Sequence, residues 1–228
     1  MRDCKIGNCD VQLPGALIEK FRSSVNWSAP NVDSQVTQLL HQLVIQRIGL
    51  YQQEGNRTLG AVYNDKKQQV NVGDQFKFLL SYSQVLPEEP KNFYNYLLSY
   101  PESQPAGVTN LYYWAKVKFG LKPTLRILHV VTMTGANPGA PAYIIAEKRL
   151  YASHYFETAL DLTYLISPSG NPKQPGFYLI KLMGSEQAGL TGFKGSIIRK
   201  KAVGKSVSAL QNSLTVIKSA LEQQPPAK

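Results

Sequence analysis

The chain has 228 residues, of which 43% are hydrophobic and 18% are charged. A chain of this size buries a core without disulfide or metal staples, as one large domain or two small ones, and its apolar runs are shorter than the roughly 20 residues of a membrane span. We therefore expect a soluble globular protein. The net charge of +10 indicates either an acidic partner surface or simply a basic exterior, and it carries no information on fold.

The two cysteines, Cys4 and Cys9, lie five residues apart around Gly7 and Asn8. This spacing suits either a small disulfide loop in an oxidising compartment or two reduced thiols. A zinc site is not expected, because there is no second cysteine pair and the next histidine is His41. No cofactor is expected either. The chain as given has no charged-then-apolar leader, which suits a mature exported protein, and we expect a bacterial periplasmic location.

Apolar residues at helical spacing dominate the first part of the chain. They predict four helices: one over residues 14–25, a long one that begins at Pro30 and ends near Gly55, one through Val72–Leu80, and one through Phe93–Leu98 that Pro101 ends. Between the second and third helices, LGAVYNDKKQQV predicts a short strand and a turn.

The Pro- and Gly-rich stretch over residues 101–107 predicts a boundary near residue 105. The helical region 1–105 and the strand-rich region 106–228 on its two sides are expected to belong to the same domain. In the second region, five runs have strand character and are separated by intervals that suit hairpins. These runs are LYYWAKVKF, TLRILHVVTMT, AYIIAEKRLY, HYFETALDLTYLI and GFYLIKLM.

Alternation in the fourth run places Phe156, Leu160 and Tyr164 on one face, with Glu157 and Asp161 on the other. This pattern is typical of an antiparallel strand with one wetter face. After the strands, a glycine-led segment carries apolar residues at a sustained helical repeat up to Leu221, which predicts a long amphipathic C-terminal helix. The predicted fold class is α+β, with a curved antiparallel sheet wrapped around this helix.

Catalytic motifs of the common hydrolase, metalloprotease, P-loop and dinucleotide-binding types are absent from the sequence, which favours a binding protein over an enzyme. His129 shares a strand face with Ile127 and Val131, so it is expected to point into a core or a cavity. There it could orient the head group of a ligand. Lys148 and Lys181 alternate with apolar residues in the same way and are similar candidates, unless they extend to solvent.

Five positive charges gather near the start of the last helix, with no acidic residue between them: Lys194, Arg199, Lys200, Lys201 and Lys205. Cations at a helix N-terminus interact unfavourably with the helix macrodipole, so this placement indicates that the cluster has a functional role. We expect docking to anionic lipid head groups, with a solvated basic face as the alternative. Nucleic acid fits less well, because no RNA-binding aromatic signature or DNA-reading motif is present.

The strand run from Leu111 to Met183, followed by the helix from about Gly192 to Gln223, resembles the helix-grip arrangement of the START and polyketide-cyclase-like superfamily. The segments YASHYFETALDLTYLI and GFYLIKLMGSEQAGLTGFKGSIIRKK also resemble hypothetical bacterial exported proteins of that type. The resemblance implies a sheet that wraps the helix around a deep apolar cavity for lipids, sterols or polyketides. The helical region 1–105 departs from the simplest form of that family, in which a strand and two short helices would be expected.

The leading hypothesis is a periplasmic protein that binds or carries a lipid-like molecule in an internal cavity. The residues expected to line the cavity are Ile127, His129, Val131, Phe156, Leu160, Tyr164, Leu210 and Leu214. The alternatives are a cyclase- or hydrolase-like enzyme that uses His129 or His154 as a base, and a module that binds a protein partner through its long helices. A solid core beside an exposed apolar stripe would be the mark of the last.

Overall fold

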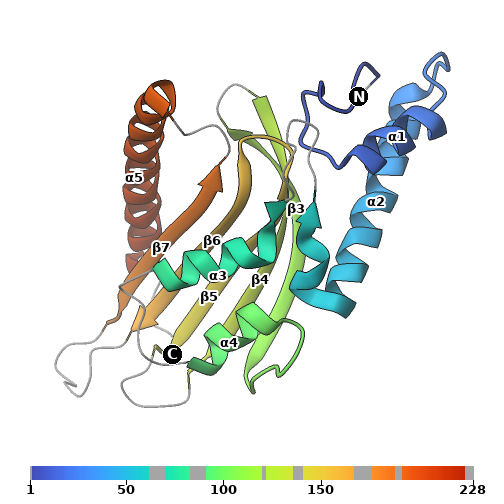
Figure 1. Ribbon diagram of the computed structural model, residues 1–228. Coiled ribbons are helices and arrows are strands. Elements are labelled where there is room, and N and C mark those ends of the chain that lie inside the picture. The colour runs from blue at the N-terminus through green and yellow to red at the C-terminus, as the bar shows by residue number, and fades with distance from the viewer. Residues whose placement is uncertain are drawn as a thin grey trace. The chain divides into compact units, whose positions relative to one another are not determined.

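The structure is a computed structural model that describes residues 2–61, 70–82, 91–119, 122–135, 141–166, 176–187 and 192–223 (Figure 1). The chain divides into two compact units, Met1–Glu186 and Gln187–Lys228. The predicted α+β class, with a five-stranded antiparallel sheet and a C-terminal helix, is confirmed. In the first unit, the expected boundary near residue 105 coincides with a change from helices to strands.

The helices are α1 (Gly15–Ser24), α2 (Val32–Glu54), the 3-10 helix η1 (Gly55–Leu59), α3 (Val72–Tyr82), α4 (Lys91–Ser99) and α5 (Gly192–Glu222). The strands are β1 (Gly60–Ala61), β2 (Val70–Asn71), β3 (Val108–Phe119), β4 (Lys122–Thr134), β5 (Tyr143–Ala152), β6 (Phe156–Ile166) and β7 (Tyr178–Gln187). The turn predicted between β1 and β2 lies outside the described residues.

The end of α2 is set by Gly55, which has a φ of 65°. A Cβ atom at this position would lie 1.6 Å from the backbone oxygen of Tyr100. Only glycine has both the required backbone freedom and the small volume. The close approach fixes the C-terminal end of α2 and the start of η1 against the segment that follows α4.

The main sheet has the strand order β3-β4-β5-β6-β7. Its register places Tyr112 opposite His129, His129 opposite Lys148, and Lys148 opposite Leu160. Directly paired residues share a face of a sheet. These four side chains therefore form one row across β3 to β6, on the face that we call the first face.

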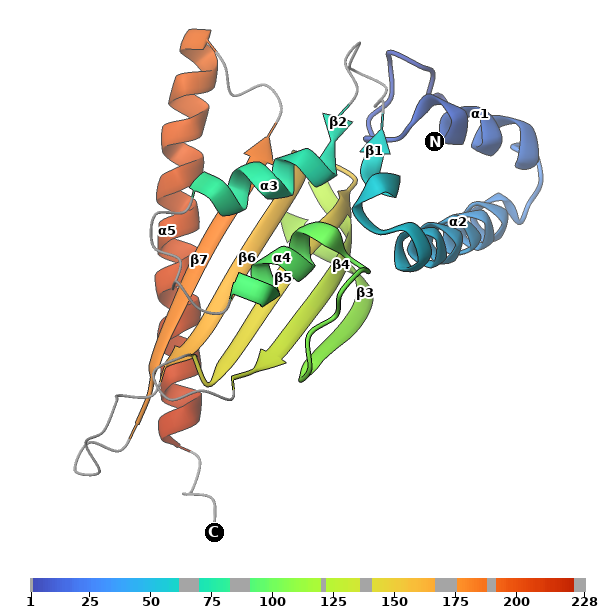
Figure 2. The same cartoon turned by 60° about the horizontal axis from the view of Figure 1, so that its bottom comes forward.

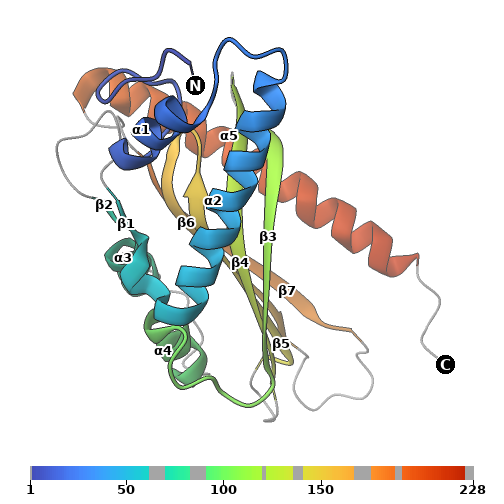
Figure 3. The same ribbon diagram turned by 90° about the vertical axis from the view of Figure 1, so that its right-hand side faces the viewer.

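The first face carries the main core. Figure 2 shows α3 and α4 crossing this face, and Figure 3 shows α2 running beside β3. The buried core residues from the helical region are Tyr51, Leu59, Val70, Val72, Phe76, Leu80, Phe93, Tyr96, Leu97 and Tyr100. Those from the strands are Val108, Ile127, Val131, Met133, Ile144, Ala146, Leu150, Leu160, Leu162 and Tyr164. The helical region and the sheet thus share one core.

The second face consists of the strand residues that alternate with this core. Among them are Leu111, Tyr113, Arg126, Leu128, Val130, Ile145, Glu147, Arg149, Ala159 and Asp161. Lys181 of β7 joins them, because its Nζ lies 3.8 Å from Oε1 of Glu147. The helices α3 and α4 lie on the first face, so neither covers this one (Figure 2).

The start of β6 departs from the predicted alternation. Glu157 Oε2 accepts a hydrogen bond of 2.7 Å from Gln75 of α3, so Glu157 lies on the helix side. The ring of Phe156 lies 4.5 Å from the guanidinium carbon of Arg149, a second-face residue. The prediction that Phe156 shares a face with Leu160 is therefore wrong. The reason is local: the regular β5–β6 register begins only at Arg149 and Ala159, three residues after Phe156.

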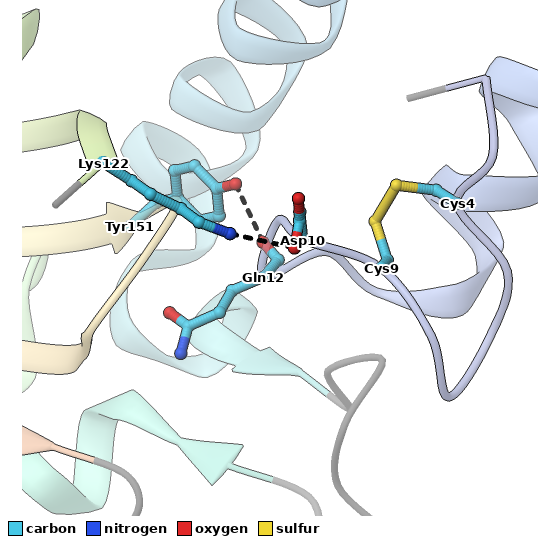
Figure 4. The surroundings of a disulfide bond; sticks show 6 residues. All are labelled: Cys4, Cys9, Asp10, Gln12, Lys122 and Tyr151. Carbon is cyan, nitrogen blue, oxygen red and sulfur yellow. Dashed lines mark hydrogen bonds and ion pairs between the residues drawn. A yellow bond between two sulfur atoms is a disulfide. The ribbon is translucent and has the colours of Figure 1, made fainter.

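Cys4 and Cys9 form a disulfide in a small N-terminal loop (Figure 4). Lys5 and Asn8 exchange backbone hydrogen bonds of 2.9 Å within the loop, and Gly7 has a φ of 85°. The left-handed backbone that closes the turn favours glycine at this position.

Polar contacts tie the segment after the disulfide to the sheet (Figure 4). Lys122 Nζ of β4 lies 2.9 Å from Asp10 Oδ1, and the hydroxyl of Tyr151 donates a 2.8 Å hydrogen bond to the Gln12 carbonyl. A small core of Cys4, Leu13 and Ile18 packs beneath this segment. The disulfide loop is therefore fixed to α1 and to the edge of the first unit.

The second unit contains α5, a helix of 31 residues. Several of its apolar side chains are exposed: Val203, Val207, Val216 and Leu221. Leu210 and Leu214 are partly exposed. None of the helices in the described ranges combines the length and the apolarity that crossing a bilayer requires.

Candidate functional site

Lys148 is the most unusual residue of the first face, because its side chain is 0% exposed. Its Nζ donates to the hydroxyl of Tyr51 (2.9 Å), to Oδ1 of Asn56 (2.8 Å) and to the carbonyl of Leu97 (2.9 Å). These acceptors belong to the end of α2, to η1 and to the last turn of α4. One lysine of β5 thereby connects three elements of the helical region to the sheet.

Aromatic rings complete the surroundings of Lys148. Its Nζ lies 5.4 Å, 4.9 Å and 5.6 Å from the ring centroids of Tyr51, Phe76 and Tyr100. Within the described residues no carboxylate forms an ion pair with it. Burial disfavours the charged form and lowers the pKa of Lys148 to about 7.

His129 continues the network in one direction. Its Nδ1 lies 2.9 Å from the hydroxyl of Tyr51, and its Nε2 lies 2.8 Å from Oδ1 of Asn110. The hydroxyl of Tyr51 accepts from Lys148 Nζ and so donates to Nδ1 of His129, while Oδ1 of Asn110 accepts from Nε2. Nε2 of His129 therefore carries the proton, and Nδ1 accepts from Tyr51. Burial, and then the charge of Lys148, lower the pKa of His129 to about 2.

This arrangement is closed rather than catalytic. His129 and Lys148 are both 0% exposed, and their polar atoms are bound to protein groups. A histidine that stays neutral down to strongly acidic pH is a poor general base at neutral pH. His154, the other candidate base, bonds through Nδ1 to Ser153 at the β5–β6 turn. The geometry therefore gives no support to acid–base chemistry at His129.

We expect Tyr51→Phe to lower the free energy of unfolding by about 1–3 kcal/mol, because it leaves His129 Nδ1 and one N–H of Lys148 buried without a partner. Urea unfolding followed by circular dichroism measures the change. The matched control is Tyr143→Phe, at a ring that is 44% exposed, where the expected change is within about 0.5 kcal/mol. Equal effects of the two substitutions would show that the hydroxyl of Tyr51 is not part of a buried network.

The second face carries a different polar cluster at its centre, made of Arg126, Glu147, Arg149, Asp161 and Lys181. Glu147 and Asp161 are directly paired across β5 and β6, and Lys181 contacts Glu147. Burial raises the pKa of Asp161 to about 6, although the charges of Lys181 and Arg149 act in the opposite direction. Three cations and two carboxylates thus share this part of the sheet.

The arginines of this cluster keep unused hydrogen-bond donors. Nε of Arg126, and Nε and Nη1 of Arg149, are buried and have no hydrogen-bond partner among the described residues. The ring of Phe156 supports the guanidinium of Arg149 from one side. Buried donors without acceptors are uncommon in native proteins and call for an explanation.

The structure brings together five of the eight residues predicted to line a ligand site: Ile127, His129, Val131, Leu160 and Tyr164. Each is at most 4% exposed on the first face. They pack against protein groups, so a ligand reaches them only if the helices move. Phe156 contacts Arg149 on the second face, and Leu210 and Leu214 belong to α5 in the other unit.

The predicted basic cluster lies on α5. Arg199, Lys200 and Lys205 are exposed there. Lys194 and Lys201 belong to the same helix, but their side chains lie outside the described part of the chain. The helix thus presents at least three positive charges to its surroundings.

Sequence reasoning missed Arg126 and Arg149. Both sit in strands, in LRIL and EKRLY. The signal that identified Lys148 and Lys181, apolar residues two positions away on both sides, does not extend to them, because Thr124 lies two positions before Arg126 and Glu147 two positions before Arg149. Tyr51, Asn56 and Asn110 were also missed, because their roles depend on contacts between segments far apart in sequence.

Searches with the chain against protein-family models, curated proteins and solved structures gave no match.

Proposed function

We propose that the protein binds a lipid-like amphiphile at the second face of its sheet. The observation that carries the proposal is the contrast between the two faces. The centre of the first face is filled by core residues, whereas the second face combines a charged centre with exposed apolar residues, Leu111 (61%) and Met183 (52%). Ligand sites are mostly apolar with a few placed polar groups, and the second face has this composition.

We further propose a helix-grip arrangement, in which α5 lies over the second face and encloses the ligand. Two features support it: α5 has an amphipathic sequence with apolar residues in need of a partner, and α3 and α4 both lie on the opposite face. Leu210 and Leu214 would then line the site, as the sequence predicts. Membership of the START and polyketide-cyclase-like superfamily is a further part of the proposal, and the resemblance of the strand run and the last helix supports it.

The location and the membrane contact are proposals of the same kind. The Cys4–Cys9 disulfide suits an oxidising compartment, which supports an exported, periplasmic protein. The exposed Arg199, Lys200 and Lys205 of α5 suit a surface that meets anionic lipid head groups during loading or release.

Co-purification tests the proposed function. The protein is purified from a bacterial host, extracted with organic solvent, and analysed by mass spectrometry for a bound amphiphile. We expect one lipid class at a near-stoichiometric amount, or uptake of a fluorescent fatty-acid analogue by the protein if it arrives empty. A protein that carries no lipid and takes up no analogue would contradict the proposal.

A protein-interaction role is the second candidate, and two observations favour it: α5 has exposed apolar residues, and the first unit has a solid core. This candidate predicts that the extracted protein is free of lipid and that α5 is instead covered by another chain. The co-purification experiment therefore separates the two candidates.

A further inference from the structure

Arg126 and Arg149 lie close together on the second face. Leu128, which follows Arg126 by two positions on β4, is directly opposite Arg149 on β5. Burial lowers the pKa of Arg149 most, the charge of Asp161 opposes this effect, and the positive charge of Arg126 lowers the pKa further. Two cations are thus held at short range in a partly desolvated position, which costs free energy unless an anion compensates.

The neighbouring carboxylates do not supply that compensation through hydrogen bonds. Glu147 pairs with Lys181 at 3.8 Å. Asp161 is near enough to affect Arg149 electrostatically, but it makes no hydrogen bond with the guanidinium in the described structure. The cluster of three cations and two carboxylates keeps an excess of one positive charge, together with the unused arginine donors.

We propose that the second face recognises the anionic head group of its amphiphile, a carboxylate or a phosphate, through Arg126 and Arg149. This inference rests on the proposed function and names the class of ligand. The guanidinium group offers donors in a planar fork that matches both kinds of oxyanion. The ring of Phe156 packs against one side of the Arg149 guanidinium. This contact restricts the side chain before the ligand binds, so less conformational entropy is lost on binding.

Three probes with the same alkyl chain test the inference: dodecanoate, dodecyl phosphate and dodecanol. Their dissociation constants are measured by calorimetry below their aggregation concentrations. We expect the wild-type protein to bind at least one of the two anions about 10-fold or more tightly than the alcohol, as charge-assisted hydrogen bonds would give. The stronger of the two anions identifies the head group.

The variant Arg126→Met/Arg149→Met removes both guanidinium groups and keeps much of their apolar volume. We expect it to bind all three probes with the affinity of the alcohol, and its unchanged affinity for dodecanol shows that it is folded. Lys116→Met/Lys118→Met is the matched control, because it removes two positive charges from exposed positions on β3. This control should keep the preference for the anion. Arg149→Lys keeps the positive charge but loses the planar fork of donors, so it should lose most of the preference for the anion. This single variant replaces the double variant if the double variant does not fold.

Two results would overturn the inference. If the wild-type protein binds the anions and the alcohol equally, the head-group assignment is wrong and the proposed function stands. If it binds none of the three probes, the proposed function fails and this inference fails with it.

Discussion

Replacing Lys148 with methionine is expected to remove most of the rise in the free energy of unfolding that the wild-type protein shows between pH 7 and about pH 9. Burial lowers the pKa of Lys148 from its ordinary value of 10.5 to about 7 in the folded protein. Between these values the unfolded chain holds a proton that the folded chain does not. Raising the pH therefore favours the folded state, by about 2 kcal/mol over this range for one fully buried lysine.

Urea unfolding at several pH values measures this slope for the wild type and for Lys148→Met. Lys116→Met is the control, because Lys116 is exposed on β3 and its replacement should leave the slope unchanged. Burial raises the pKa values of the buried tyrosines in the folded protein, and in the unfolded chain they titrate near 10.0, above the pH range of this experiment. These tyrosines are also common to all three proteins. If the free energy of unfolding of Lys148→Met rose with pH as steeply as that of the wild type, Lys148 would not be the titrating group.

Replacing Gly55 with alanine is expected to destabilise the first unit by several kcal/mol or to prevent its folding. The new Cβ would lie 1.6 Å from the backbone oxygen of Tyr100, and the φ of 65° is strained for any residue with a side chain. To relieve the clash, the end of α2 must move away from Tyr100, whose ring stacks on Tyr51 at 4.9 Å. The shift would also pull Tyr51 away from Lys148 and His129.

Gly49→Ala is the matched control, because Gly49 lies inside α2, the helix that Gly55 ends. A Cβ at Gly49 meets no atom within 4 Å. Alanine there should stabilise the protein by about 0.5–1 kcal/mol, because glycine is a poor helix former. Thermal unfolding of the two variants measures the contrast. Similar melting temperatures for the two would show that the close approach at Gly55 is absent in solution.

The order of helices and strands follows from the sequence, because each element carries a local repeat. Alternation along LRILHVV also groups Ile127, His129 and Val131 correctly on one buried face. The repeat does not reveal what covers that face. The helices of the first unit fill it, so residues expected to touch a ligand instead hold a core together.

The partners of the buried polar residues could not be predicted for a related reason. Tyr51 and His129 are separated by 78 positions, and Lys148 and Asn56 by 92. Their contacts depend on how the end of α2 and η1 meet β4 and β5. The misplacement of Phe156 has a local cause, since regular pairing of β6 with β5 begins only at Ala159.

Quenching of tryptophan fluorescence by a brominated long-chain carboxylate tests the central claim, that the ligand lies on the second face. Trp114 lies on the first face of β3, opposite Ile127 and 6.0 Å from the ring of His41 of α2. It remains as the sole tryptophan in the variant Trp27→Phe. The variant Trp27→Phe/Trp114→Phe/Leu111→Trp places the sole tryptophan on the second face of the same strand. The proposed site predicts strong quenching in the Leu111→Trp variant and little in the other, whereas quenching confined to Trp114 would place the ligand on the helix-covered face and contradict it.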